Sequence, residues 1–369
     1  MAVLSHDEMN WNQMEHSIIC KSPDGVIRWA FLIDRHIFRT SSYITVKEDV
    51  MKAEESFLHI FSVGLRPILE RLDLQNLQEI RLRAGLPLLV KHGGREYFVS
   101  ENGELTATMQ NVRSVTKREL QETMEYMVNR SMYAFEDEIR QGFLTLPGGH
   151  RVGLAGKIIL EDGKVKHIKH ISCLNVRLSH QIKGCADEAL PYLLQENEPC
   201  HTLIISPPGC GKTTLLRDLI RQISNGTGYF HGCTVGVVDE RSEIGGSYLG
   251  SRQNDLGIRT DVLDCCPKSE GMMMLVRSMA PRVIAVDEIG DSRDIQAIET
   301  VIHCGCRLIA TVHGSTMEDI EKKPLLQKLV RERVFQRYLL LQDSSHIGQI
   351  RAIFDERGTD LYRRGGQSC

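Results

Sequence analysis

Apolar residues in the C-terminal half of the chain form short runs that are separated by segments of helical period. The runs predict strands over residues 202–206, 234–239, 283–287 and 307–312. The intervening segments predict helices over residues 212–224, 268–279 and 292–304, and two more strands are expected over 337–341 and 349–354. Because strands and helices alternate, this part of the chain is expected to fold as an α/β domain around a mostly parallel sheet.

The preceding part of the chain has a mixed pattern. Apolar positions predict a helix over residues 56–72, and Thr116 with Glu119 forms a capping-box pattern that opens a helix over 116–129. Strands are expected over residues 79–83, 87–90, 142–146, 152–155, 157–160 and 165–167, with glycines at the turns between them. This order predicts a smaller α+β domain.

The first part of the chain follows neither pattern. Both tryptophans, Trp11 and Trp29, lie there, and one strand is expected over residues 26–33. We therefore expect three parts, namely an N-terminal extension over 1–52, an α+β domain over 53–190 and an α/β domain over 191–369.

Composition narrows the possible classes of protein. The chain has 369 residues, of which 41% are hydrophobic and 25% charged, and its net charge is −3. Such a balance is typical of a globular protein of two domains and disfavours a surface that coats nucleic acid. There is no signal-peptide pattern and no run of about 18 apolar residues, so membrane association is expected only through a partner.

The cysteines do not suggest a metal site. There are 11 of them, and none forms a C-x-x-C pair; the tight sets are Cys265 with Cys266 and Cys304 with Cys306. Zinc sites use wider, paired spacings, so we expect reduced cysteines in a cytoplasmic protein and no metal bound by them.

A phosphate-binding loop is the strongest chemical signal. The motif Ser206-Pro-Pro-Gly-Cys-Gly-Lys-Thr-Thr214 lies between a predicted strand and a predicted helix, although Ser206 stands where the motif has its first glycine. Backbone amides and the helix N-terminus would hold phosphates, Lys212 would contact the β- and γ-phosphates, and Thr213 would bind Mg²⁺. The expected nucleotide-binding residues are Pro208, Gly209, Cys210, Gly211, Lys212, Thr213 and Thr214.

Acidic residues follow the next apolar strands. Asp287 and Glu288 end the strand over 283–287, where Asp287 would hold Mg²⁺ through water and Glu288 would act as general base. Asp239 and Glu240 end another strand and could position water or metal, while Arg241 and Glu243 could equally pair on the surface.

A fourth strand end carries Thr311 and His313, which are placed to sense the γ-phosphate. A structural role for His313 is about equally consistent with the pattern.

These four elements, in this order, resemble the secretion ATPase superfamily. The segment Arg277-Ser-Met-Ala-Pro-Arg-Val-Ile-Ala-Val-Asp-Glu-Ile-Gly-Asp291 looks like its Walker B region, Asp239 with Glu240 its Asp box, and Thr311-Val-His313 its His box. The resemblance implies a RecA-like P-loop NTPase domain that binds ATP and Mg²⁺.

Longer motifs resemble the stage III sporulation protein AA family over residues 56–357. They are Glu79-Ile-Arg-Leu-Arg83, Tyr133-Ala-Phe-Glu-Asp-Glu-Ile-Arg-Gln-Gly142, Pro147-Gly-Gly-His-Arg-Val-Gly-Leu-Ala-Gly156, His170-Ile-Ser-Cys-Leu-Asn-Val-Arg177 and Asp239-Glu-Arg-Ser-Glu-Ile-Gly245. This resemblance implies an ATPase of the mother-cell cytoplasm that docks on membrane proteins of a secretion-like complex around the forespore.

The resemblance also implies a homo-oligomer, expected to be a hexamer, in which one subunit supplies an arginine to its neighbour's nucleotide. An arginine donated in this way can raise the rate about 10³- to 10⁵-fold. The candidates are Arg140, Arg151, Arg177, Arg259 and Arg277, each of which could instead form an ordinary surface ion pair. The expected catalytic set is Glu288, Lys212, Glu240, His313, Arg259 and Arg277.

Two other functions fit a P-loop. The chain could be an ATPase that acts on single-stranded nucleic acid, although it has no aromatic-studded basic stretch suited to base stacking. It could also be a scaffold that binds ATP with little turnover, although Glu288 would then have no need to be a general base.

Overall fold

The computed structural model describes residues 18–21, 27–30, 57–129, 135–342 and 348–362. The chain divides into two compact units, Met1–His59 and Ile60–Cys369. In the first unit, β1 (Ile18–Lys21) pairs antiparallel with β2 (Ile27–Ala30), which lies within the strand expected over 26–33. Trp11 and most of the expected extension lie outside the described residues, as do Tyr133 and its neighbour in the second family motif.

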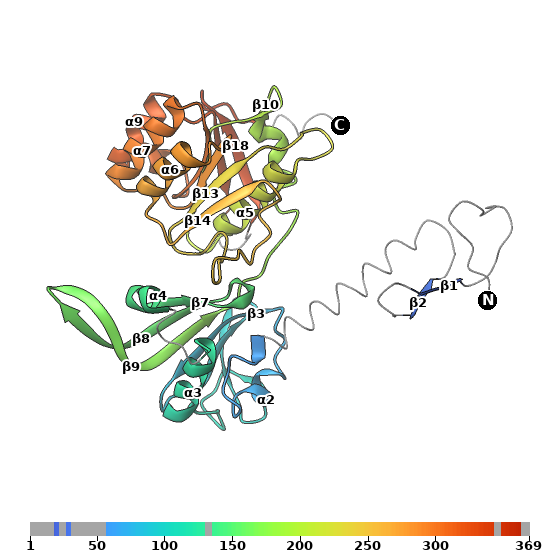
Figure 1. Cartoon of the computed structure of the whole chain (residues 1–369), viewed down its shortest axis with the longest axis vertical. Helices are drawn as coiled ribbons and strands as arrows, with labels where there is room; N and C mark the ends of the chain where they lie inside the picture. The colour runs from blue at the N-terminus through green and yellow to red at the C-terminus, as the bar shows by residue number, and fades with distance from the viewer. Residues whose placement is uncertain (1–17, 22–26, 31–56, 130–134, 343–347, 363–369) are drawn as a thin grey trace. The chain divides into compact units, whose positions relative to one another are not determined.

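The second unit begins with an antiparallel sheet, which we call the first sheet and which is blue to green in Figure 1. In spatial order its strands are β6 (Leu105–Thr106), β5 (Arg95–Val99), β4 (Leu89–His92), β3 (Leu77–Arg83), β9 (Lys164–Arg177), β8 (Arg151–Glu161) and β7 (Phe143–Thr145). In β3 the buried Ile80 and Leu82 alternate with the partly exposed Arg81 and Arg83, which is the pattern of a sheet with one face on a core.

The helix expected over residues 56–72 is wrong as a continuous element. Among the described residues of this range, Phe57 and Leu58 are helical, and α2 (Arg66–Leu69) follows after a break with Pro67 in its first turn. Pro67 lacks the amide that a continuous helix would need at that position, so the chain turns through 59–65 instead. The helix expected over 116–129 is confirmed as α3 (Lys117–Met127), with the capping box of Thr116 and Glu119 formed.

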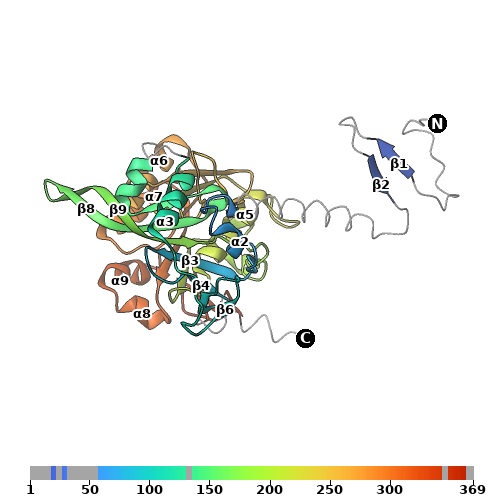
Figure 2. The same cartoon turned by 90° about the horizontal axis from the view of Figure 1, so that it is seen from below.

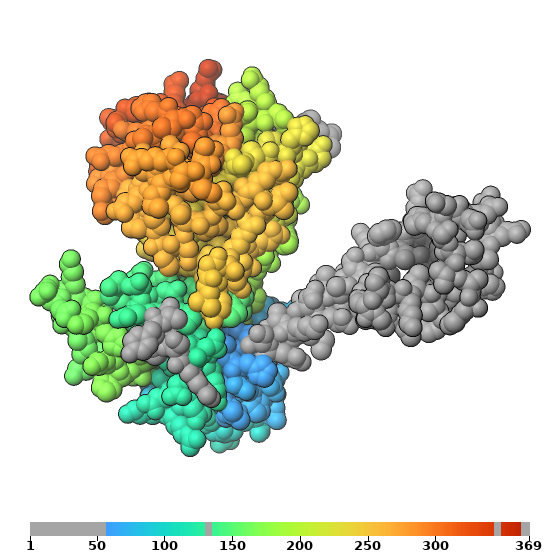
Figure 3. All heavy atoms as spheres, in the orientation of Figure 1, coloured from blue at the N-terminus to red at the C-terminus, as the bar shows by residue number. Residues whose placement is uncertain are grey.

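Strands β8 and β9 form a long two-stranded ribbon that extends beyond the rest of the first sheet (Figures 1 to 3). We expected a break at Gly156 and an end at residue 167, and both expectations are wrong. The register shifts between Ala155 and Lys157, and a Cβ on Gly156 would lie 2.8 Å from the carbonyl oxygen of Lys169. The glycine therefore allows a bulge within one strand instead of ending it.

The C-terminal part of the second unit is built on the second sheet. In spatial order its strands are β14 (Thr260–Asp264), β13 (Val235–Asp239), β15 (Val283–Val286), β16 (Arg307–His313), β12 (Thr202–Ser206), β17 (Arg337–Leu341) and β18 (Ile350–Asp355). All pairings are parallel except that of β17 with β18. The sequence missed β14 at the edge, where Thr, Asp, Val, Leu and Asp show no alternation.

Helices cover both faces of the second sheet. Successive residues of each strand point to opposite faces, so apolar residues of one strand pack in two different cores. Ile204 packs with Leu216 and Leu219 of α5 (Lys212–Asn225), whereas Leu203 and Ile205 pack in a second core. That second core contains the buried faces of α6 (Lys268–Ser278), α7 (Ser292–His303) and α9 (Pro324–Arg331). The short helices α4 (Glu136–Gln141) and α8 (Met317–Glu321) were not expected, since neither carries a long apolar stripe.

The connection between the two sheets joins the core around α5 earlier than the expected boundary at residue 191. Ala186, Ala189 and Leu190 are already buried against α5 and its neighbours. The short hairpin of β10 (Leu194–Gln195) and β11 (Glu198–Pro199) follows before β12 begins. Both sheets lie within one compact unit, so the division into an α+β and an α/β domain stays a prediction.

Candidate functional site

The glycine-rich loop lies between the carboxyl end of β12 and the first turn of α5. Gly209 and Gly211 have φ angles of 75° and 91°, which favour glycine. No side chain caps the N-terminus of α5, so no side chain occupies the amides of its first turn. Ser206, the departure from the motif, is buried and donates its hydroxyl to the carbonyl oxygen of Pro207 at 2.9 Å. The loop is therefore shaped to present amides to an anion.

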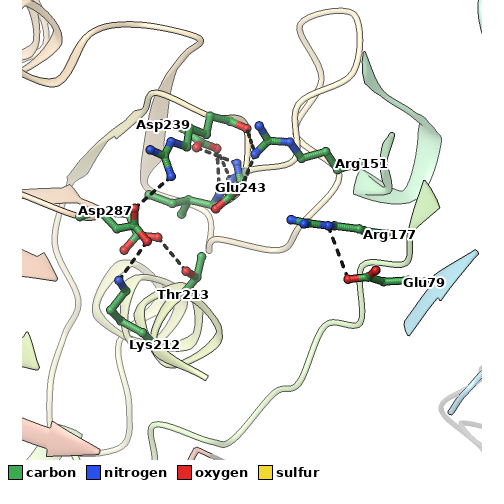
Figure 4. Close-up of polar contacts among 12 residues, drawn as sticks. Glu79, Arg151, Arg177, Lys212, Thr213, Asp239, Glu243 and Asp287 are labelled. Atoms are coloured by element: carbon green, nitrogen blue, oxygen red, sulfur yellow. Dashed lines mark hydrogen bonds and ion pairs between the residues drawn. The ribbon is translucent and has the colours of Figure 1, made fainter. Parts of the chain in front are cut away.

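Two contacts connect the start of α5 to the end of β15 (Figure 4). The Thr213 hydroxyl donates to Asp287 Oδ2 at 2.7 Å, and Lys212 Nζ lies 3.2 Å from Glu288 Oε1. Lys212 is 6% exposed, so its charge is held largely away from water. Glu288 has a φ of 54°, a left-handed conformation that turns its side chain off the line of the strand.

The Glu288 carboxylate is contacted by basic side chains from three segments of the chain. Besides Lys212, His313 Nε2 lies 2.9 Å from Oε1 and Arg241 Nη1 lies 3.0 Å from Oε2. Burial alone would raise the pKa of Glu288, but Lys212, His313 and Arg241 outweigh burial and lower it. Glu288 is therefore held as a carboxylate, the form that a general base needs.

The end of β16 braces both acidic residues. The Thr311 hydroxyl donates to Asp287 Oδ1 and accepts the backbone amide of Glu288 at 2.9 Å. His313 Nδ1 is buried and has no hydrogen-bond partner among the described residues. Thr311 thus positions the acidic pair, and His313 contacts the same carboxylate as Lys212.

Asp239 has a different environment from Asp287. It is buried at the end of β13, where its carboxylate accepts the amides of Glu243 at 2.8 Å, Ile244 at 2.9 Å and Gly245 at 2.7 Å. Burial raises the pKa of Asp239 to about 6, although these amides favour its ionised form. Asp239 therefore shapes the turn after β13, which we call the 240–245 turn. Its neighbour Glu240 is ion-paired with Lys268 of α6.

A small pocket lies among these groups. It is lined by Asp239, Glu240, Arg241, Glu243, Lys268, Asp287 and Glu288. Its position beside the carboxyl ends of β13 and β15 is where open α/β sheets bind their ligands.

The candidate arginines are scattered. Arg151 contacts Glu243 and the carbonyl oxygen of Arg241, Arg177 lies 3.7 Å from Glu79, and Arg140 pairs with Asp137 at 2.7 Å. Figure 4 shows Arg151 and Arg177 on the side of the 240–245 turn away from Lys212.

The two remaining candidate arginines, Arg259 and Arg277, lie in the part of the chain that is built on the second sheet. Arg259 donates to the carbonyl oxygens of Ser224 at 2.6 Å and Asn225 at 3.2 Å, so it closes the C-terminal end of α5, opposite to the end that follows the loop. Arg277 is exposed in the last turn of α6.

Arg241 is the site residue that sequence reasoning missed. We left a surface ion pair open as an alternative for it and did not include it in the expected catalytic set, whereas its guanidinium reaches Glu288. The available signal was its place two residues after a strand-end carboxylate, but the partner is distant in sequence and only the folded sheet brings the two together.

The residues present fit a nucleotide with Mg²⁺. No atom lies within 4 Å of an ideal Cβ on Gly209, so a phosphate can approach the backbone there. Thr213 and Asp287 supply the hydroxyl and carboxylate oxygens that Mg²⁺ prefers. Among the described residues, no three His, Cys, Asp or Glu side chains are placed so that they could hold a metal ion by themselves.

The loop, helix and acidic strand ends place the chain among α/β proteins with a ligand site at one edge of a parallel sheet. The chain belongs to the family described as "Sporulation stage III, protein AA", whose sequence model matches residues 51–361. Stage III sporulation protein AA of Bacillus subtilis (strain 168) is 42% identical over 290 residues, which cover 79% of this chain and 90% of that protein. The family resemblance in the sequence is thereby confirmed.

A shorter match covers only part of the chain. Protein SEEDLING PLASTID DEVELOPMENT 1 of Arabidopsis thaliana is 34% identical over 134 residues, which are 35% of this chain and 18% of that protein.

Solved structures similar to this chain include secretion and pilus ATPases. The Legionella pneumophila ATPase DotB gives a TM-score of 0.48 at 16% identity and covers 74% of each chain. The pilus retraction motor PilT with bound ADP gives a TM-score of 0.47 at 14% identity over 76% of this chain and 78% of PilT. Within the described part of the chain, no helix is long and apolar enough to span a bilayer.

Proposed function

We propose that this chain is a Mg²⁺-dependent ATPase, a motor of the secretion ATPase type that powers a sporulation-specific secretion or channel complex between mother cell and forespore. The observation that carries the proposal is the pair of contacts across the site, Thr213 with Asp287 and Lys212 with Glu288. They bring the N-terminus of α5, the Thr213 hydroxyl and two carboxylates to one edge of the sheet. A RecA-like P-loop domain uses these groups for phosphoryl transfer.

Each residue would have a separate task. The amides of residues 208–214 and the N-terminus of α5 would bind the phosphates, and Lys212 would neutralise part of their charge. Thr213 and Asp287, the latter through water, would hold Mg²⁺, which when bound neutralises charge on the phosphate oxygens. Glu288 would orient and deprotonate the attacking water, because it is held ionised beside the same groups.

The surrounding residues would adjust this centre. We propose that His313 and Thr311 report the presence of the γ-phosphate to Glu288, since both contact the acidic pair. Glu240 would act through its ion pair with Lys268 at the edge of the pocket. Arg277 is exposed and could reach a neighbouring subunit, whereas Arg259 is engaged with the end of α5 and would have to release it first.

The assembly belongs to the same proposal. We expect a homo-oligomer, a hexamer, in the mother-cell cytoplasm, bound to membrane proteins of the complex. The membership of the sporulation family supports this setting. An ATPase that acts on single-stranded nucleic acid is the alternative, and no site contact described above favours it.

The test is ATP turnover by the purified full chain. Lys212→Ala should lower turnover and nucleotide affinity together, because Lys212 contacts the phosphates. Glu288→Gln should lower kcat by about 10²-fold or more and leave nucleotide affinity nearly unchanged, because the amide keeps the shape but cannot accept the proton.

Wild-type turnover of Glu288→Gln would contradict the catalytic assignment. Strong stimulation of wild-type turnover by single-stranded DNA or RNA would instead favour the nucleic-acid alternative.

A further inference from the structure

The 240–245 turn contacts both the acidic site and the first sheet. On one side, the Arg241 guanidinium reaches Glu288, with Nη1 lying 3.0 Å from Oε2. Lys212 and His313 contact the other oxygen of that carboxylate, Oε1. Arg241 therefore holds one oxygen of Glu288 while Lys212 and His313 hold the other, and the carboxylate is fixed at both oxygens.

On its other side, the same turn is held by Arg151 of β8. Arg151 Nη1 donates to the carbonyl oxygen of Arg241 at 3.0 Å and is ion-paired with Glu243 (Figure 4). The guanidinium of Arg151 also lies over the ring of Phe143 in β7, 4.1 Å from its centroid. The Arg151 side chain thus packs on the first sheet and also contacts the turn. Its contact with the turn therefore depends on the position of the first sheet.

The turn itself has little freedom between these two contacts. Three of its amides are bound to the buried carboxylate of Asp239, and Ser242 has a φ of 53°. Because a short turn held at its amides moves as one piece, a change at the carbonyl of Arg241 changes the direction of its side chain as well.

We propose that Arg241 is a positioning residue that links the first sheet to the general base. Arg151 holds the peptide of Arg241, and the side chain of Arg241 holds Glu288. The turnover of each subunit then depends on the placement of its own first sheet, in addition to any arginine supplied by a neighbouring subunit. This inference rests on the proposed ATPase function.

The first test separates positioning from nucleotide binding. Arg241→Ala should lower kcat of the full chain about 10- to 100-fold, since a small displacement of a reacting group has an effect of this size. The dissociation constant of ATP, measured by equilibrium binding, should change less than about 2-fold, because Arg241 contacts Glu288 and not the glycine-rich loop. Arg241→Lys should recover part of kcat, since lysine keeps the charge but not the planar donor group.

The second test asks whether Arg151 acts through Arg241. Arg151→Gln should lower kcat about 3- to 30-fold. The double variant should be no slower than Arg241→Ala alone, because the relay is already broken there. Arg118→Ala is the matched control, since Arg118 is an exposed arginine of the same part of the chain that pairs with Glu122, and it should leave kcat unchanged.

Effects of Arg151 and Arg241 that multiply in the double variant would overturn the inference, as would a loss of ATP affinity in Arg241→Ala as large as its loss of kcat. Either result would leave the proposed function standing if Glu288→Gln is inactive. Absence of turnover in the wild-type chain would overturn both.

Discussion

The first sheet and the second sheet, as the described residues form them, have the same number of strands but are buried in different ways. In the second sheet every residue of β12, β13 and β15 is buried, because helices cover both faces. In the first sheet Arg95 and Glu96 of β5 are exposed, and Leu160 near the tip of β8 is 61% exposed. The doubly covered sheet brings the carboxyl ends of its strands together at a rigid edge, and the candidate site lies there.

The first sheet contributes to the site differently. It offers one fixed side chain, Arg151, to the turn that approaches Glu288, and no acidic group of its own lines the pocket. The groups that line the candidate site thus come from the part built on the parallel sheet, while the antiparallel sheet contacts the turn beside them.

Removal of a leucine side chain should give the largest difference in unfolding free energy between the two sheets. Leu308 of β16 is fully buried, so Leu308→Ala should lower the free energy of unfolding by about 2 to 5 kcal/mol. Leu160→Ala, the matched change in the first sheet, should lower it by no more than about 0.5 kcal/mol. Urea denaturation followed by circular dichroism measures both, and equal losses would contradict the contrast in burial.

One histidine associated with each sheet should make stability fall in mild acid. Burial lowers the pKa of His150 and of His201 to about 4, and each ring accepts a backbone amide, from Ser179 at 3.0 Å and from Leu308 at 3.2 Å. A folded pKa below the unfolded value near 6.5 gives stability that is present above pH 6.5 and lost as pH falls towards 4.

The loss for His201 should amount to about 3 kcal/mol at most. It should shrink in His201→Asn, which keeps an acceptor that does not titrate. An unchanged slope of unfolding free energy against pH in that variant would show that His201 does not titrate as described.

The smallest effect concerns helix caps, in which the two parts are alike. Thr116 caps α3 and Asp291 caps α7, each with a complete capping box. Thr116→Ala and Asp291→Ala should each lower the free energy of unfolding by about 1 kcal/mol, because each leaves an amide of the first turn without its acceptor. The exposed residues Lys117 of α3 and Gln296 of α7 provide control substitutions. A cap variant as stable as its control would show that this cap does not stabilise its helix.

Local patterns in the sequence were enough for most of the second sheet. The runs at 283–287 and 307–312 are continuous because their strands are buried on both faces, and the amphipathic segments between them became α6 and α7. The capping box at Thr116 also formed, since it depends only on residues three apart.

Local patterns failed where the phase of a strand changes. In β9 the apolar residues Ile168 and Ile171 are three apart, and His170 between them has a φ of 49°, so alternation is interrupted although the strand continues. The prediction of a helix over 56–72 was wrong for the opposite reason. The apolar stripe is continuous through Pro67, but the helix is not.

The sequence by itself determined the family, the glycine-rich loop and the presence of Asp287 and Glu288 at a strand end, because each depends on neighbouring residues. Only the tertiary structure decided what these groups contact. In the folded chain Asp239 accepts hydrogen bonds from backbone amides, Arg259 donates to carbonyl oxygens at the end of α5, and Arg241 contacts Glu288. The order of strands across a parallel sheet is set by long-range packing, and that order decides which strand ends become neighbours.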